Sequence, residues 1–280
     1  MDTKEEDYVV DLFAASTHDN LMFFTNKGRV YLLKVYEIPE ISRQSRGKAI
    51  VNLLTLLPNE SVNAMIPIKE FDNGHNLIMC TRMGIIKKTP LSAYKNIRSN
   101  GLIAIGLDEG DELISVKLTN GDQEVLIATM KGKVNRFSEK EVRSVSRKAG
   151  GVIGIRLNEK DKVIGMEVVS EGTTVLTICE NGFGKRTTIA DYVQTHRGTH
   201  GIINIKTSDR NGEVVAIASV TDDDQLLVGT KDGIMMRVKV NEIREISRYT
   251  QGVRIITLKS DDDAVVAVAK LVSEKKEEEI

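Results

Sequence analysis

Five arginines recur at near-constant spacing in this chain, and each lies three or four residues before a glycine. The arginines are Arg43, Arg98, Arg147, Arg197 and Arg248, and the glycines are Gly47, Gly101, Gly151, Gly201 and Gly252. A guanidinium group binds phosphate oxygens through charge and paired hydrogen bonds, and a neighbouring glycine leaves backbone N–H groups accessible to the same anion. The pattern therefore indicates phosphate binding rather than bond-making chemistry.

A second set of glycines precedes these arginines by 14 or 15 residues and defines a repeat of about fifty residues. This set is Gly28, Gly84, Gly132, Gly182 and Gly233. Each ends an apolar run, such as LIMCTRMG at Gly84, which predicts a strand entering a hairpin. The period is typical of blades rather than of a helical solenoid. The glycine after each arginine opens another apolar stretch, where a positive φ or a close backbone approach is expected.

The composition favours an all-β protein with one continuous repeat. Hydrophobic residues make up 41% of the 280 residues, tryptophan is absent and aromatics are 4%, so the core must consist mainly of Val, Ile and Leu, which suit strands. No apolar run could span a bilayer, and the acidic start argues against a signal peptide, so we expect a cytoplasmic, nucleoid-associated protein without a membrane partner. Cys80 and Cys179 are expected to be reduced and buried.

Charge is segregated within each repeat although the net charge is only -1. Five segments running from the turn glycine to the next apolar strand hold 25 Lys or Arg and 7 Asp or Glu. These segments are 28–54, 84–107, 132–156, 182–206 and 233–254. Acidic clusters such as Asp222 to Asp224 fall in the other connection. The pattern predicts a basic band that attracts phosphate backbones and a separate acidic one.

Other site chemistries are disfavoured by the residue patterns. The stretch from Gly182 to Thr187 lacks the first glycine of a phosphate-binding loop and has Arg186 where Ser or Thr should follow the lysine. His196 and His200 lie in a glycine-containing loop without a third ligand nearby. We find no nucleophile, acid or base constellation, and therefore expect no catalytic residue, no metal and no cofactor.

Duplex DNA is the expected ligand, because few aromatics accompany the basic loops and single-strand binding relies on stacking. Cations three or four residues after the turn glycine are expected to add a second row to the surface. The predicted DNA-binding residues are Arg43, Arg46, Lys48, Lys87, Lys88, Arg98, Arg136, Arg147, Lys148, Lys185, Arg186, Arg197, Arg237, Arg248 and Arg254.

Three segments resemble the C-terminal domain of the bacterial DNA gyrase A protein, and the resemblance extends over essentially the whole chain. They are residues 16–54, ENGFGKRTTIADY at 180–192 and TQGVRIITL at 250–258. The resemblance implies a β-pinwheel, a propeller-like disc of about five to six four-stranded blades in which blades exchange strands with their neighbours. It would occupy residues 8–273, between an N-terminal extension (1–7) and an acidic tail (274–280).

The resemblance also implies a function and partners. In this family duplex DNA is bent or wrapped around a basic rim, largely independently of sequence, and the wrapping lets an ATP-dependent type IIA topoisomerase introduce negative supercoils. The catalytic tyrosine and the ATPase lie in other domains, so this chain would not itself be an enzyme. Its partners would be DNA, the rest of the gyrase A protein and, through the holoenzyme, the gyrase B protein. The isolated domain is expected to be monomeric.

Departures from the family pattern leave alternatives open. The family has six repeats and a QRRGGKG-type box, whereas this chain shows five copies, with degenerate echoes of the box at 43–49 and 194–201. The chain is expected to begin just past the box. The corresponding C-terminal domain of topoisomerase IV and a protein-binding propeller are the alternatives. A hydrolytic propeller would need central carboxylates or histidines, and the acidic residues fall in turns instead.

Overall fold

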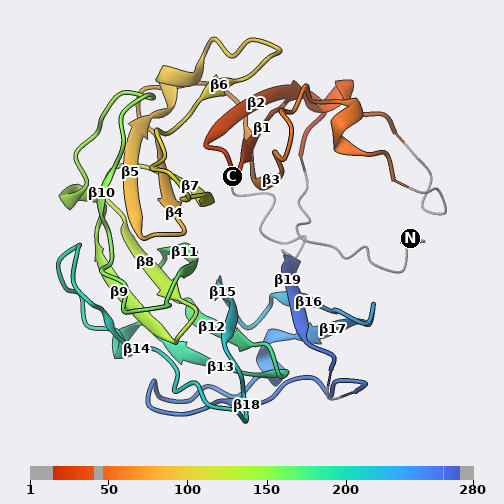
Figure 1. Ribbon diagram of the computed structural model, residues 1–280, viewed down its shortest axis with the longest axis vertical. Helices are drawn as coiled ribbons and strands as arrows, with labels where there is room; N and C mark the ends of the chain where they lie inside the picture. The colour runs from red at the N-terminus through yellow and green to blue at the C-terminus, as the bar shows by residue number, and fades with distance from the viewer. Residues whose placement is uncertain (1–14, 41–46, 261, 272–280) are drawn as a thin grey trace.

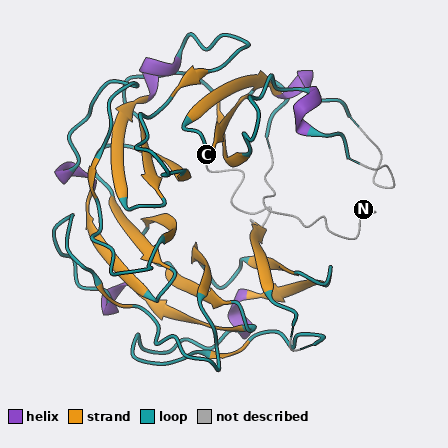
Figure 2. Ribbon diagram, in the orientation of Figure 1, coloured by secondary structure: helices purple, strands orange, loops and turns teal. Residues whose placement is uncertain are grey.

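The computed structural model describes residues 15–40, 47–260 and 262–271, which form five antiparallel β-sheets arranged around a ring (Figures 1 and 2). Each sheet is one blade, as the all-β pinwheel prediction required. The first blade has the order β3 (Val62–Ile68), β1 (Asn20–Thr25), β2 (Arg29–Lys34) and β6 (Leu102–Ile103). The second has the order β10 (Val152–Ile153), β5 (Ile85–Pro90), β4 (Asn76–Thr81) and β7 (Leu113–Thr119).

The remaining blades repeat this plan. The third has the order β11 (Val163–Val169), β8 (Glu124–Thr129), β9 (Lys133–Ser138) and β14 (Ile202–Ile203). The fourth has the order β15 (Val214–Val220), β12 (Thr174–Cys179), β13 (Phe183–Thr188) and β18 (Val253–Arg254). The fifth, within the described residues, has three strands: β17 (Met235–Lys239), β16 (Gln225–Thr230) and β19 (Val265–Leu271).

Short 3-10 helices follow the second hairpin strand of each repeat. They are η1 (Val35–Glu37), η3 (Leu91–Tyr94), η4 (Glu139–Glu141), η5 (Ile189–Asp191) and η6 (Val240–Glu242), and a further one, η2 (Ile50–Asn52), lies in the first repeat. Among the described residues, no helix is long and apolar enough to cross a membrane.

Neighbouring repeats exchange strands. β10 follows the hairpin of the third repeat in sequence, yet it pairs with β5 of the second blade, where Val152 lies opposite Ile86. β6, β14 and β18 pair in the same way with β2, β9 and β13. These two-residue strands lie at the outside of the ring, while β7, β11 and β15 lie nearer its centre (Figure 1). Each repeat therefore completes the outer edge of the preceding blade.

The repeating glycines occupy the positions that this exchange requires. Gly132 closes the hairpin that the sequence predicted and has a φ of +77°, and a Cβ there would lie 2.3 Å from the Ile205 carbonyl oxygen. Gly151 lies where an outer loop crosses β5, and a Cβ would lie 2.3 Å from the Ile86 carbonyl oxygen. Real Cβ atoms do not approach an oxygen so closely, so both glycines are needed for the backbones to meet.

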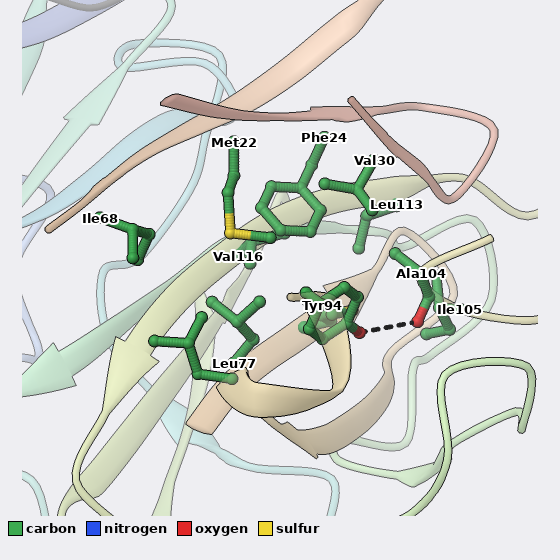
Figure 3. Close-up of a cluster of buried hydrophobic side chains, with 12 residues drawn as sticks. Met22, Phe24, Val30, Ile68, Leu77, Tyr94, Ala104, Ile105, Leu113 and Val116 are labelled. Carbon is green, nitrogen blue, oxygen red and sulfur yellow. Dashed lines mark hydrogen bonds between the residues drawn. The ribbon is translucent and has the colours of Figure 1, made fainter. Parts of the chain in front are cut away.

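Apolar clusters fill the spaces between adjacent blades. In one of them, Met22 and Phe24 from β1 pack with Leu77 from β4 and Val116 from β7 (Figure 3). Tyr94 lies in the same cluster, and its hydroxyl donates to the Ala104 carbonyl at 3.2 Å. Adjacent blades from the first to the fifth thus share apolar contacts, as expected when each unit cannot bury its apolar face alone.

Both cysteines are buried and free, as the sequence predicted. Burial raises the pKa of the Cys80 thiol far above its ordinary range and that of Cys179 to about 12. Thiols in such surroundings stay protonated and behave as small apolar groups.

Candidate nucleic-acid interface

The outer edge of the ring is formed by four corresponding segments, residues 95–106, 143–156, 193–206 and 244–254, which we call the rim belt. Each segment runs from a 3-10 helix through the arginine and glycine of the repeat to the exchanged outer strand. The belt contains eleven Lys or Arg and one Glu, and none of the eleven cations is buried. The part of the basic band that lies in the rim belt is therefore placed where a polyanion can reach it.

Backbone hydrogen bonds join successive segments of the rim belt. Gly106 N donates to Ala149 O at 3.2 Å, Gly198 N donates to Gly154 O at 2.7 Å, and Lys206 N donates to Thr250 O at 2.9 Å. Each bond links one repeat to the next, so the four loops form a continuous track around the described ring. A track of this kind keeps the spacing between its cations fixed.

Four of the five recurring arginines lie in this belt. Arg98 is exposed, and Arg147, Arg197 and Arg248 are half-buried. Arg197 donates from Nε to Glu141 O at 3.1 Å and from a terminal nitrogen to Ile153 O at 3.4 Å, and Arg248 donates to the equivalent Ile203 O at 2.7 Å. These contacts fix the guanidinium groups at the outer strand of the preceding repeat.

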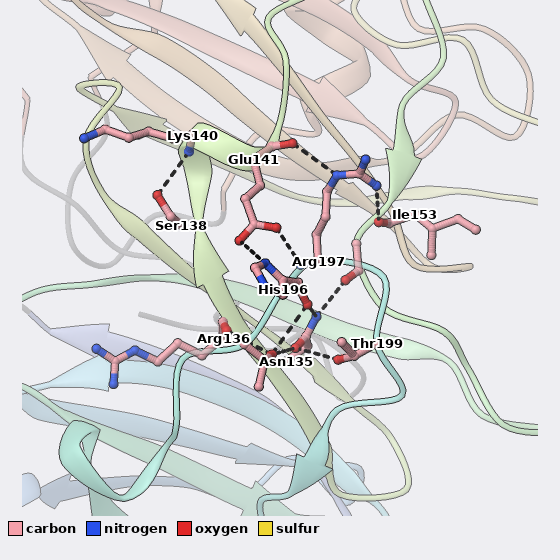
Figure 4. A network of polar contacts seen from close by, with 11 residues as sticks. Asn135, Arg136, Ser138, Lys140, Glu141, Ile153, His196, Arg197 and Thr199 are labelled. Atoms are coloured by element: carbon pink, nitrogen blue, oxygen red, sulfur yellow. Dashed lines mark hydrogen bonds and ion pairs between the residues drawn. The ribbon is translucent and has the colours of Figure 1, made fainter.

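Polar contacts hold the loop around Arg197 (Figure 4). The Glu141 carboxylate accepts from the Arg197 backbone N at 3.1 Å and faces His196 Nδ1 at 3.2 Å. Asn135 Oδ1 accepts from the Thr199 hydroxyl at 2.9 Å. His196 therefore lies in a loop, as predicted, and faces a carboxylate of η4 in the preceding repeat.

The expected second row of surface cations is wrong for four of its six members, because their side chains are buried. Lys87 and Lys185, three residues after their turn glycines, are 1% and 0% exposed. Lys88 and Arg186, one position further on, are 7% exposed. The loop of the following repeat covers each of these strands and encloses both of its faces. None of these four side chains is therefore a surface cation.

The residues four positions after the turn glycine bind the 3-10 helix of the following repeat. Lys88 Nζ donates to Glu139 O at 2.8 Å, and Arg186 Nε donates to Ile243 O at 2.8 Å. Arg136, which is half-buried, donates to Ile189 O at 2.9 Å and to Tyr192 O at 2.8 Å, and its guanidinium pairs with Glu124. These cations join blades, whereas Arg237 in the fifth blade is exposed and donates to Gln225.

The remaining predicted site residues fall into two groups. Lys48, Lys148 and Arg254 are exposed, and the Arg254 guanidinium lies 5.1 Å from the centre of the Phe183 ring. Arg43 and Arg46 lie outside the described residues, as do the predicted N-terminal extension and acidic tail.

Several residues of the acidic connections have a structural role that the sequence did not reveal. The carboxylates of Asp111, Asp161 and Asp263 accept from the backbone N of Met83, Lys131 and Asp232, at 2.9, 3.0 and 3.0 Å. Each acceptor fixes the hairpin turn of its own blade. The recurring aspartate before the inner strand is the signal that could have indicated this, because Asp side chains commonly bind turn backbone.

The fold and the rim belt define a class: a β-pinwheel in which each repeat lends a strand to the preceding blade and cations follow the outer edge. The chain belongs to the family described as DNA gyrase C-terminal domain, beta-propeller, which matches residues 19–69, 75–120, 123–170, 173–221 and 224–271. These five matches coincide with the five repeats found from the glycines.

Curated relatives agree with this membership. The DNA gyrase A protein of Halalkalibacterium halodurans is 52% identical over 271 residues, covering 97% of this chain and 32% of that protein. The DNA gyrase A protein of Clostridium acetobutylicum is 48% identical over 278 residues, covering 99% and 33%. The chain thus spans about a third of the length of these relatives.

Solved structures show the same fold. A DNA gyrase A C-terminal domain matches with a TM-score of 0.79 and 28% identity, covering 92% of this chain and 84% of that one. The C-terminal domain of a DNA topoisomerase IV matches with a TM-score of 0.84 and 28% identity, covering 92% and 80%.

Proposed function

We propose that this chain binds duplex DNA along the rim belt and wraps it, as the C-terminal module of the A protein of a gyrase, an ATP-dependent type IIA topoisomerase. The observation that carries the proposal is the continuous track of eleven unburied cations with a single glutamate. Family membership and the gyrase A relatives support it. Its partners would be DNA in the nucleoid, the rest of the gyrase A protein and, through the holoenzyme, the gyrase B protein.

A continuous track suits the energetics of wrapping. Bending a 20–30 base-pair site by 40–90° costs on the order of 1–6 kcal/mol, so contacts must continue along the whole arc to offset it. Four linked loops with two to four cations each distribute contacts in this way. Because such contacts fall on the phosphate backbone, base sequence would matter mainly through its bendability.

Charge reversal of the rim arginines tests DNA binding. We expect the variant R98E/R147E/R197E/R248E to lose most of its affinity for duplex DNA in a low-salt gel shift. A control variant with the same charge change, K27E/K160E/K231E/K259E, alters exposed lysines in hairpin turns and acidic connections and should bind more tightly than the rim variant. Equal affinity of the two variants, or a parent protein that does not bind DNA, would contradict the proposal and favour a protein-binding propeller.

A topological assay separates wrapping from binding alone. A relaxed circular plasmid is incubated with the protein, treated with a nicking-closing enzyme and stripped of protein. Wrapping changes the linking number in proportion to bound protein, and the rim variant should leave it unchanged. Tight binding without any change in linking number would limit the function to DNA binding.

A further inference from the structure

We infer that Lys87, Asn135 and Lys185 are positioning residues. Their buried side chains bind the backbone of three rim loops and hold these loops in place. The loops are those that carry Arg147, Arg197 and Arg248. The inference rests on the proposed function, because it assigns these three residues a role in presenting the rim belt to DNA. They occupy the same position, three residues after the turn glycine, in three successive blades.

Lys87 shows the arrangement in the second blade. Its ammonium donates to the carbonyl oxygen of Arg147, the rim arginine of the third repeat, and at 2.7 Å to Ala104 O. Ala104 directly follows the exchanged strand β6. One buried side chain therefore links the backbones of two adjacent rim loops.

Asn135 and Lys185 make equivalent contacts. Asn135 Nδ2 donates to His196 O at 3.1 Å and to Gly154 O at 2.9 Å, and Gly154 occupies the position of Ala104 in its repeat. Lys185 Nζ donates to Ser247 O at 3.0 Å. His196 and Ser247 directly precede the rim arginines Arg197 and Arg248. All three side chains thus bind the loop backbone at the arginine or one residue before it.

Lysine is an unusual residue at a buried position, and two of these three residues are lysines. Burial, with the nearby Arg147 as a smaller cause, lowers the pKa of Lys87 to about 8. Burial and Arg248 similarly lower the pKa of Lys185 to about 8, although Asp191 favours its charged form. An apolar residue would avoid the free-energy cost of burying an ammonium group. The fifth blade has Met236 at the equivalent position, where no described loop passes over it. Buried side-chain donors to a rim-loop backbone therefore occupy this position in the second, third and fourth blades, whereas the equivalent Tyr31 of the first blade donates to the Glu60 carboxylate.

Hydrogen exchange of the free protein tests the positioning role without DNA. We expect Lys87→Met to speed amide exchange in residues 143–151 at least about 10-fold, because the loop loses its buried donor. Exchange in β8 and β12 should stay unchanged. Lys148→Met is the matched control, since it removes an exposed lysine from the same loop and should leave exchange as in the parent. Unchanged loop exchange in a folded Lys87→Met protein would overturn the inference.

A double-mutant cycle tests whether Lys87 acts on DNA through the loop. Lys87→Met should weaken DNA binding about 3–10-fold in the parent but less than about 2-fold in an Arg147→Ala background, since coupled residues are not additive. Full additivity would mean that Lys87 acts independently of Arg147 and would contradict the inference. Lys87→Gln, which retains a donor, should recover part of the affinity and provides a second variant if Lys87→Met does not fold.

The cycle also separates the two proposals. If Arg147→Ala weakens DNA binding and Lys87→Met leaves both affinity and loop exchange unchanged, the positioning role fails while the proposed function stands. If Lys87→Met loosens the loop and neither variant changes DNA affinity, the loop is held as described but the rim is not the DNA-binding surface.

Discussion

The fourth and fifth blades differ in how their second hairpin strand is covered, although the two strands occupy the same place in the repeat. In β13, Lys185 and Arg186 are buried, and both donate to backbone carbonyls of the following repeat. In β17, the equivalent Met236 is 38% exposed and Arg237 is also exposed. At the first of these two positions, the apolar Met236 is therefore exposed while the cation Lys185 is buried. Burial at these positions is created by the next repeat and not by the strand's own sequence.

The glycines that follow the recurring arginines show the same contrast between covered and uncovered positions. Gly151 crosses β5 of the preceding blade, whereas at the equivalent Gly47 no atom of the described residues, apart from its chain neighbours, lies within 4 Å of the position that a Cβ would occupy. Within the described residues, the loop of the first repeat has no preceding blade to cross. The comparison separates residues that are required for blade exchange from residues that merely recur with the repeat.

The largest expected effect comes from filling the space at Gly151. Gly151→Ala places a methyl group 2.3 Å from the Ile86 carbonyl oxygen, which is backbone and cannot rotate away. We expect a loss of about 3 kcal/mol in the free energy of unfolding, the upper end of the range for overpacking. Gly47→Ala is the matched control and should change stability by less than about 0.5 kcal/mol. Similar urea midpoints for the two variants would show that the loop does not cross the strand as described.

The next effect compares two arginines at the same repeat position. Arg186→Ala removes the donor to the buried Ile243 carbonyl and the ion pair with Asp222. Leaving a buried acceptor unpaired should cost roughly 2 kcal/mol. Arg237→Ala alters an exposed side chain and should cost less than about 0.5 kcal/mol. Thermal denaturation of both variants measures the difference, and an equal cost would remove the distinction between β13 and β17.

The pH dependence of stability should reveal the buried lysines. The folded pKa of Lys87 and of Lys185 is about 8, below the ordinary value of 10.5. Between these values the unfolded chain binds more protons than the folded one, so each lysine makes stability rise with pH by at most about 1.4 kcal/mol per unit. Below pH 8 both states are protonated and this contribution to the slope disappears.

The control for this measurement is the double variant K87M/K185M. Buried tyrosines and cysteines, whose pKa values are raised, make stability fall at high pH in both proteins. The difference between parent and variant isolates the lysines. If the unfolding free energies of parent and variant change with pH at the same rate from pH 8 to 9.5, the pKa values of the two lysines are not lowered by folding.

The smallest effect is expected at Met236. Replacing it by lysine restores the residue found in the second and fourth blades, but without a covering loop the ammonium would stay in water. Met236→Lys should therefore change the free energy of unfolding by less than about 0.5 kcal/mol. A loss comparable with that of Arg186→Ala in the same thermal denaturation assay would show that β17 is covered after all.

The sequence predicted the repeat and its hairpin turns because these depend on local features. The turn glycine Gly132 and the apolar run before it can be read within a few residues. The pairing of β10 with β5 could not be read in this way, because the two strands lie far apart in the chain and share only two residue pairs. The repeat boundaries could thus be read from local features, whereas strand exchange was implied only by the family resemblance, and the pairing of β10 with β5 confirms it.

The candidate site was predicted less completely for the same reason. Alternation along a strand predicts that one of Lys87 and Lys88 faces solvent, yet both are buried because a loop from the next repeat covers the outer face of β5. The charge pattern predicted a basic band but could not distinguish cations that face outward from cations that bind the neighbouring repeat. Only the three-dimensional contacts separate Lys87 from Lys148.

The most direct test of the rim belt is the salt dependence of its affinity for duplex DNA. If about ten phosphates are contacted, log affinity should fall with log salt concentration with a slope of about -9. Replacing Arg98, Arg147, Arg197 and Arg248 by alanine should flatten this slope by roughly 3 to 4, since each cation releases about one counterion. A slope that is shallow in the parent, or equally steep in the alanine variant, would contradict the account.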